Sequence, residues 1–169
     1  MAGAGTVGLE MLEDVPEADV VVVQVGGGGL VSGIATAVKG MKPDVRVVAV
    51  EPEKSPALHE SLKAGEPVTV DAKSIADGLN GPYAGANCVR VCTELGVESV
   101  LVTEDALREA FRFMYGRMKL ACEVAGAATA AALLSGVVEL DGARRVAAVV
   151  SGGNVAAETA AAILAGDEA

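Results

Sequence analysis

The sequence predicts a three-layer αβα fold, in which helices cover both faces of a mostly parallel sheet. Two apolar strands, residues 20–25 and 45–50, are joined by a segment with helical spacing, and such a unit makes its strands parallel. A similar strand, turn and helix follows at residues 146–164. The composition is 51% hydrophobic but only 2% aromatic, so the core must be small aliphatic residues packed around glycine. This favours α/β layering over a β-sandwich.

The chain is long enough for one substantial core, and we expect either one unit or two small lobes. Residues 1–50 are expected to form the first part of the unit, and residues 51–169 its remaining helices and strands. A short helix opens the chain and ends near Leu12, with Thr6 as its cap. A turn at residues 16–19 then leads into the first strand.

The first strand runs directly into four glycines, Gly26, Gly27, Gly28 and Gly29, followed by Leu30 and a helix. Without Cβ atoms, backbone N–H groups converge there at the positive end of the helix dipole, which suits a phosphate. The alternative is a tight turn without a ligand. The dinucleotide pattern GxGxxG lacks its last glycine, and Ile34 and Ala35 stand where GxxxxGK[ST] needs lysine and a hydroxyl. We therefore expect a single phosphate held mainly by backbone.

After the second strand, Ser55 and Pro56 favour a helix start with Ser55 as the cap. This helix carries Leu58 and Leu62 inward and ends near Gly65. We then expect a short strand at residues 68–70, a loop at 74–82, a helix at 87–95 and a strand at 97–102. The loop contains glycines and an aspartate, so it is either part of a site near a strand end or a solvent-facing turn.

The next helix begins at residues 103–105 with acidic groups in its first turn. We interpret its apolar stripe as core, because it follows a 3.6-residue period: Leu107, Ala110, Phe111, Met114 and Met118. Glu123 then precedes an alanine-rich helix at residues 126–134. A carboxylate in such apolar company is costly unless it is paired, so Glu123 lies at the mouth of a site or is functional.

Ser151 lies between the last strand, residues 146–150, and an alanine-rich helix that ends at Leu164. Ligands of open parallel sheets bind outside the carboxyl ends of the strands. Ser151 and the glycine run are therefore expected to face one crevice. The alternative is a second plain turn between a strand and a helix.

The bulk properties exclude several classes of protein. A net charge of −10 argues against nucleic-acid binding, which needs clustered Lys and Arg. Three cysteines without CxxC spacing fit buried thiols in a reducing cytoplasm better than disulfides or zinc. His59, the only histidine, is expected to be solvated on a surface helix rather than part of a catalytic triad. We find no membrane span and no signal peptide, so a cytoplasmic location is expected.

The chain resembles the fold-type II pyridoxal-phosphate enzymes, which share the tryptophan synthase β-like fold, and specifically their threonine dehydratase and serine racemase branch. The resemblance covers nearly the whole chain and rests on an ordered set of motifs. In chain order these are residues 5–10 (GTVGLE), 25–33 (VGGGGLVSG), 50–52 (VEP), 75–78 (IADG), 117–120 (RMKL), Glu123 and 151–154 (SGGN).

The resemblance implies roles for particular residues. The amides of the glycine run and Leu30 would hold the cofactor phosphate. Ser151 would hydrogen-bond the pyridine nitrogen and leave it largely unprotonated, which moderates the electron sink in favour of elimination. Glu51 resembles a divalent-cation ligand of the branch, and Ser55 would offer a carbonyl. Ala57 stands where some members carry an aspartate, so the resemblance is weaker at the cation site.

The family's Schiff-base lysine, substrate-carboxylate loop and reprotonating serine belong to an N-terminal segment that this sequence does not match. The lysines present lie outside the family's lysine motif: Lys39, Lys42, Lys54, Lys63, Lys73 and Lys119. We therefore expect the C-terminal half of a pyridoxal-phosphate-dependent serine or threonine ammonia-lyase or racemase. Alone it is expected to be inactive and to bind the cofactor non-covalently at most.

Two hypotheses about partners follow. A half-enzyme would associate with the missing N-terminal half, and an amino acid would be a substrate only of the intact enzyme. A non-catalytic binding module would keep the anion loop and self-associate as a homodimer, because a sheet without its neighbours leaves apolar surface and a strand edge uncovered.

Overall fold

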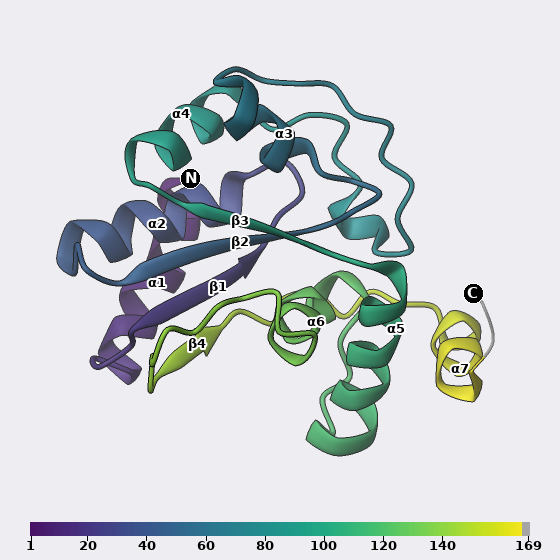
Figure 1. Ribbon diagram of the computed structural model, residues 1–169. Coiled ribbons are helices and arrows are strands. Elements are labelled where there is room, and N and C mark those ends of the chain that lie inside the picture. The colour runs from purple at the N-terminus through teal and green to yellow at the C-terminus, as the bar shows by residue number, and fades with distance from the viewer. Residues whose placement is uncertain (167–169) are drawn as a thin grey trace.

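Within residues 1–166, which the computed structural model describes, four strands form one parallel sheet in the order β3-β2-β1-β4 (Figure 1). The strands are β1 (Val20–Gln24), β2 (Arg46–Pro52), β3 (Glu98–Val102) and β4 (Val146–Ala148). The register places Val22 of the central strand β1 between Val48 of β2 and Ala148 of β4. All four strands therefore end at the same edge of the sheet.

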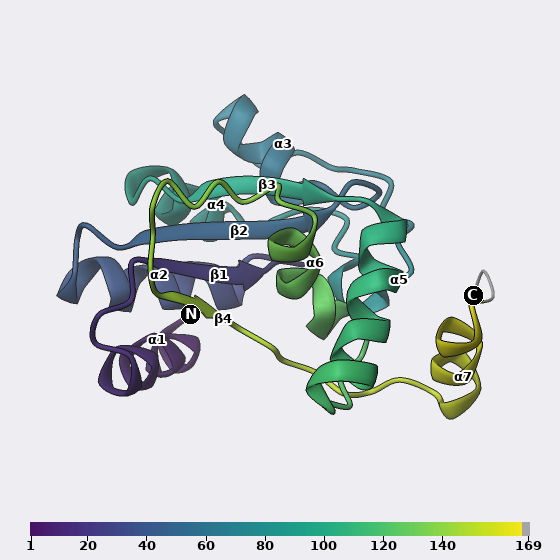
Figure 2. The same ribbon diagram turned by 60° about the horizontal axis from the view of Figure 1, so that its bottom comes forward.

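Alternating side chains of the strands enter two separate cores. Helices lie on both faces of the sheet, which confirms the predicted three layers (Figure 2). Val21, Val23 and Val47 pack toward the helices α1 (Ala2–Asp14), α2 (Gly29–Met41), α3 (Ala57–Ala64) and α4 (Ala86–Glu94). Val20 and Val22 face the opposite core, which is formed with the helices α5 (Glu104–Phe113), α6 (Ala128–Leu134) and α7 (Ala157–Ala165). Burying valines on both faces explains the continuous apolar run of β1.

Two predicted helix caps were wrong. Helix α1 begins at Ala2, and the hydroxyl of Thr6 donates to the Gly3 carbonyl at 2.8 Å inside the helix. Helix α3 begins at Ala57, and Ser55 does not cap it, because its hydroxyl donates to the Leu79 carbonyl instead. Both hydroxyls therefore donate to backbone carbonyls, one within the same helix and one in a distant loop, and neither caps a helix.

Three further predictions were corrected. Residues 68–70 do not form a strand, although the Val70 amide donates to the Pro82 carbonyl at 2.9 Å. Met118 is exposed because the helical stripe changes to a π-helical turn, Met114–Met118, which rotates it away from the core. His59 is half-buried rather than solvated, and its Nδ1 lies 3.0 Å from the Ser99 hydroxyl. Burial lowers the pKa of this imidazole.

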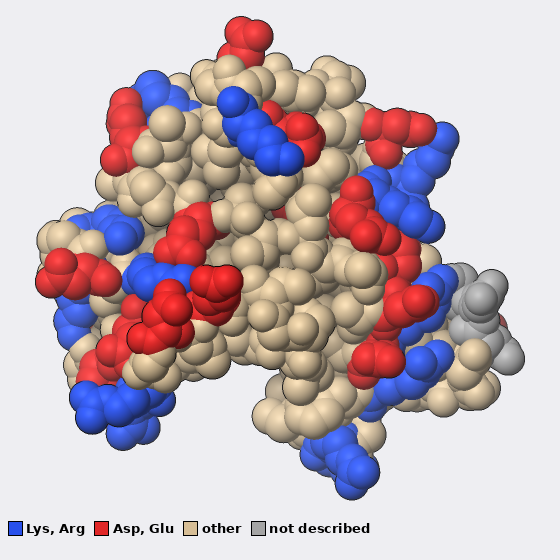
Figure 3. Space-filling view, viewed as in Figure 1, with Lys and Arg blue, Asp and Glu red and all other residues tan. Residues whose placement is uncertain are grey.

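Charged side chains of both signs lie next to one another on the face seen in Figure 3. Between neighbouring strands, Arg46 of β2 forms a bidentate ion pair with Glu98 of β3, with nitrogen–oxygen distances of 2.7 and 2.8 Å. The prediction that the chain binds no nucleic acid is compatible with this mixed surface and stays a prediction. In the described part of the chain, no helix is long and apolar enough to cross a membrane.

Candidate functional site

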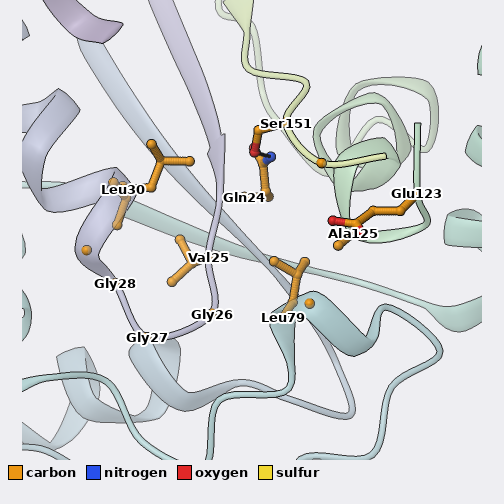
Figure 4. A pocket seen from close by; sticks show the side chains of 14 residues that line it. Gln24, Val25, Gly26, Gly27, Gly28, Leu30, Leu79, Glu123, Ala125 and Ser151 are labelled. Carbon is orange, nitrogen blue, oxygen red and sulfur yellow. Dashed lines mark hydrogen bonds between the residues drawn. The ribbon is translucent and has the colours of Figure 1, made fainter. Parts of the chain in front are cut away.

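A cavity of about 220 Å³ lies at the carboxyl end of β1, between the glycine turn and the segment after β4 (Figure 4). The structure brings together residues that are more than a hundred positions apart, since Ser151 and the glycines line the same cavity. The two turns therefore face one crevice, as expected. The lining consists of Gln24, Val25, Gly26, Gly27, Gly28, Gly29, Leu30, Val31, Gly78, Leu79, Glu123, Ala125, Ser151 and Gly152.

The glycine turn presents unused backbone donors to this cavity. Within residues 1–166, no amide from Gly26 to Leu30 donates a hydrogen bond to the protein. Gly28 precedes α2 with a φ of 86°, a left-handed conformation that favours glycine. A Cβ added at Gly27 or Gly29 would meet no atom within 4 Å, so the missing side chains leave open space for a ligand. The geometry suits an anion at a helix N-terminus.

The loop that follows α3 closes the cavity from the other side. A Cβ on Gly26 would lie 3.2 Å from the Gly78 carbonyl oxygen, and one on Gly81 would lie 3.1 Å from the Gly26 carbonyl carbon. Backbone therefore packs directly on backbone, which only glycine permits at such a distance. Of the two interpretations of residues 74–82, the structure supports a loop that borders the candidate site.

This loop is braced by a carboxylate at the start of α5. Glu104 is buried, and its two oxygens accept from the Ser74 hydroxyl at 2.7 Å and the Ile75 amide at 2.9 Å. The side chain of Asn80 closes the loop through hydrogen bonds with the Ser74 amide and carbonyl. Sequence reasoning placed Glu104 in the first turn of its helix but missed this role, because the partners lie about thirty positions away.

The Ser151 hydroxyl is held by Gln24, the last residue of β1. Fixed backbone groups on both sides set the orientation of the Gln24 amide: its Nε2 donates to the Val149 carbonyl at 3.1 Å, and its Oε1 accepts from the Ser151 amide at 3.2 Å. The same Oε1 accepts from the Ser151 hydroxyl at 2.6 Å. Sequence reasoning missed Gln24, although a single polar residue at the end of a valine strand was a usable signal.

Glu123 reaches the cavity from the segment before α6, as Figure 4 shows. A Cβ added at Gly152, whose φ is 90°, would collide with Oε1 of Glu123, so the carboxylate lies against the glycine turn after Ser151. Within residues 1–166, no side-chain hydrogen bond or ion pair holds this carboxylate. Glu123 therefore lies at the mouth of the candidate site, which is one of the two alternatives expected for it.

Glu51 and Ser55 lie outside the lining of the cavity. Each Glu51 oxygen accepts one backbone amide at the start of α3, from Leu58 and from His59, both at 2.7 Å. Burial nevertheless raises the pKa of this fully buried carboxyl to about 7. The described residues contain no group of three or more His, Cys, Asp or Glu side chains arranged to hold a metal. The predicted divalent-cation role of Glu51 and Ser55 stays a prediction.

The lining of the cavity contains no lysine. Several lysines are engaged on the surface instead: Lys39 donates to the Pro43 carbonyl, Lys63 pairs with Glu60, and Lys73 pairs with Asp71. The residues present thus fit two parts of a pyridine phosphate, a phosphate at the bare amides and a ring nitrogen at Ser151. They do not supply an amine for covalent attachment.

Sequence comparisons with known proteins identify relatives of this chain in one family of enzymes. A sequence family described as "Pyridoxal-phosphate dependent enzyme" matches residues 1–152. L-threonine ammonia-lyase of Thermotoga maritima is 40% identical over 92% of this chain and 38% of that protein. Phenylserine dehydratase of Ralstonia pickettii is 40% identical over 93% of this chain and 48% of that protein.

The fold comparison finds a relative of the same kind. The structure of maize serine racemase superposes with a TM-score of 0.88 at 36% identity, over 93% of this chain and 49% of that one. The chain therefore spans less than half the length of each of these three relatives.

Proposed function

Because the chain belongs to the pyridoxal-phosphate-dependent enzymes, within the dehydratase and racemase branch of fold type II, we propose that it supplies the phosphate and ring-nitrogen contacts of a serine or threonine ammonia-lyase. The observation that carries this proposal is the shared cavity. Bare amides line one side of it, and the Ser151 hydroxyl lies across from them.

Each part of the cavity has a defined task in this proposal. The unused amides from Gly26 to Leu30 bind the phosphate, assisted by the dipole of α2. Ser151 fixes the edge of the ring that carries the nitrogen. When bound, pyridoxal phosphate supplies an electron sink for the amino acid's α-carbon. The packed backbone of Gly26 against Gly78 and Gly81 keeps these donors in place before the ligand arrives, which lowers the ordering cost of binding.

We propose that the chain alone turns over no substrate. No lysine lines the cavity, so this chain's cavity offers the cofactor no covalent anchor. The lysine and the substrate-carboxylate loop would come from a segment that corresponds to the N-terminal half of the relatives. An amino acid is then a substrate only of the assembled enzyme, and the choice between serine and threonine belongs to that segment.

The test is a binding and complementation experiment. Pyridoxal phosphate is added to the chain, absorbance is recorded, and borohydride reduction followed by mass spectrometry detects any lysine adduct. We expect saturable binding without a specific adduct, and pyruvate or 2-oxobutyrate formation only after an N-terminal half is mixed in. A specific adduct on one lysine would refute the non-covalent proposal. Absence of both association and product would refute the half-enzyme.

A second candidate is a non-catalytic, self-associating module that uses the loop for another anion. It is favoured by the outer edge of β4, which pairs with no strand within residues 1–166. Leu140 and Val150, on the segments before and after this strand, and Leu134 at the end of α6 are each at least 40% exposed. A homodimer, or a segment that corresponds to the N-terminal half of the relatives, would cover such an edge. Light scattering separates the cases, because a monodisperse monomer at micromolar concentration rules out the homodimer.

The cysteines support the proposed reducing, cytoplasmic setting. Cys88, Cys92 and Cys122 are all buried and free. Burial raises the pKa of the Cys92 and Cys122 thiols, so both remain protonated and unreactive at neutral pH.

A further inference from the structure

We propose that Asp19 and Gln24 are positioning residues, which fix the register of β4 on β1 and so hold Ser151 opposite the glycine turn. Asp19 stands directly before β1, and Gln24 is the last residue of that strand. This inference deepens the proposed function and rests on it for the identity of the ligand. The register itself is a property of the ligand-free chain.

The sequence of β4 does not set its own register. The strand pairs with β1 through three residues, and no strand pairs with its other edge within residues 1–166. Residues 146–150 are all valine or alanine, so a slip by one or two positions would still place apolar side chains on both faces of the sheet. Ser151 is exposed, so burial does not hold it either. Other contacts must therefore fix the register.

The register of β4 decides where Ser151 lies relative to the glycine turn, because that turn continues directly from β1. A strand advances by about 3.3 Å per residue, so a slip by one residue would carry Ser151 about that far along the sheet. Hydrogen bonds span a range of only about 0.5 Å in length. After such a slip, one ligand could no longer reach both turns.

Asp19 fixes the point at which β4 begins. Its Oδ2 accepts from the amides of Arg144 and Arg145 at 2.8 and 2.9 Å, and these are the two residues before β4. The Asp19 amide in turn donates to the Arg145 carbonyl at 2.9 Å. The hydrogen bonds from the Arg145 and Arg144 amides lower the pKa of Asp19, so the carboxylate remains an acceptor. A slip of β4 would separate these partners.

Gln24 fixes the segment that follows β4. Its Nε2 donates to the Val149 carbonyl at 3.1 Å, and its Oε1 accepts from the Ser151 amide at 3.2 Å. The side chain of Gln24 is 4% exposed, so water does not readily replace these partners. A slip by one residue would break both hydrogen bonds and leave a buried amide unsatisfied, which is costly.

Helix α6 and the residues before it contact the same segment, but they do not join it to β1. The Thr129 hydroxyl donates to the Val149 carbonyl at 2.8 Å, and the Glu123 amide donates to the Gly152 carbonyl at 3.1 Å. The glycine turn, by contrast, is a continuation of β1. The two turns are therefore related to each other through the contacts that β1 makes at its two ends.

The register is tested first without a ligand, by amide hydrogen exchange. Asp19→Ala and Gln24→Met each remove the contact at one end of β1. In both variants the Val149 amide, which is bonded to β1, should exchange at least about tenfold faster. The Val25 amide, which is bonded to β2, should change by less than about threefold. An unchanged Val149 amide, or equal acceleration of both amides, would overturn the proposal.

Two matched controls address charge and local packing. Asp44 is an exposed carboxylate that lines the same surface cavity as Asp19, and its side chain makes no hydrogen bond within residues 1–166. Thr129→Val removes the other donor to the Val149 carbonyl. Asp44→Ala and Thr129→Val should each change the exchange of the Val149 amide by less than about threefold. Acceleration in Thr129→Val as large as in Gln24→Met would assign the register to α6 and overturn the role of β1.

The consequence for the site is tested with pyridoxine 5′-phosphate, which has no aldehyde and cannot form an adduct with a lysine. In the wild-type chain, binding should shift the amide resonances of the glycine turn and of Ser151. In Asp19→Ala the glycine turn should still respond, whereas the shift of Ser151 should fall below about half and the affinity about threefold or more. Asp19 lies at the end of β1 away from the cavity, so this effect reaches Ser151 through β4.

The conservative variant and the remaining outcomes complete the test. Asp19→Asn keeps a side-chain acceptor and should restore the response of Ser151, and a full response in Asp19→Ala would refute the positioning role. If the wild-type chain binds no pyridoxine phosphate, the proposed function fails, and exchange in the ligand-free chain still decides the register. If Gln24→Met does not fold, Asp19→Ala decides alone, because Asp19 is exposed and its replacement leaves the core intact.

Discussion

Replacing Gly27 by alanine should change the affinity for the phosphate without lowering the stability of the fold. A Cβ at this glycine would meet no protein atom within 4 Å, and its φ lies outside the left-handed region. The residue is also exposed. The added methyl group therefore causes little strain in the folded protein. Because alanine has less backbone freedom than glycine in the unfolded chain, the substitution should stabilise the fold by about 0.4–1 kcal/mol.

The same methyl group would stand where the phosphate is proposed to lie. Losing one hydrogen bond to a charged group costs about 1.5–3 kcal/mol, and 1.4 kcal/mol is a factor of ten in affinity. Gly27→Ala should thus weaken the binding of pyridoxal phosphate at least about tenfold. Isothermal titration calorimetry measures the affinity, and urea unfolding followed by circular dichroism measures the stability.

The matched control is Gly40→Ala, since Gly40 lies in α2 beyond the site and also has open space around it. This substitution should raise the free energy of unfolding by about 1 kcal/mol, the usual gain inside a helix, and leave the affinity unchanged. Equal affinities of the wild-type chain and Gly27→Ala would refute the phosphate site. A large loss of stability in Gly27→Ala would refute the open geometry.

Three further predictions concern the glycine turn, the loop that borders the cavity and a buried cysteine. Gly28→Ala should lower the free energy of unfolding by about 1–3 kcal/mol. The reason is that φ at this residue is 86° and that the new methyl group would lie 2.8 Å from Cβ of Cys88. An unchanged midpoint of urea unfolding would contradict this prediction. Glu104→Ala removes one buried and one partly buried hydrogen bond, so it should lower the free energy of unfolding by about 1.5–3 kcal/mol. The control Asp105→Ala, at the exposed neighbour, should lower it by under about 0.5 kcal/mol. Equal losses of the two variants in urea unfolding would argue against the brace. Burial raises the pKa of Cys92 to about 12, so iodoacetamide at pH 8 should label this thiol only after the chain unfolds. Mass spectrometry detects the label, and rapid labelling of the folded chain would disprove the burial of Cys92.

The strands and helices that position the site could be predicted because their patterns are local. The valine run of β1, the glycines after it and the apolar residues 100–102 of β3 each depend on neighbouring residues only. The expectation that Ser151 faces the glycine turn also held, since parallel strands share a carboxyl edge.

Several of the errors occurred where a side chain has a distant partner. Ser55 has the sequence signature of a helix cap, but its hydroxyl donates to the Leu79 carbonyl instead. The free amides at the start of α3 donate to the Glu51 carboxylate. Gln24 and Glu104 were missed for the same reason, because their partners come from other segments of the chain. Hydrogen bonds of this kind depend on tertiary structure and leave no periodic signal in the sequence.

The most direct test of the central claim is a 1H–15N chemical-shift titration of the chain with pyridoxine 5′-phosphate. If one ligand bridges the two turns, the amides from Gly26 to Leu30 and the amide of Ser151 should shift together, with one common dissociation constant. Shifts confined to one of these turns, or centred elsewhere on the sheet, would contradict the account.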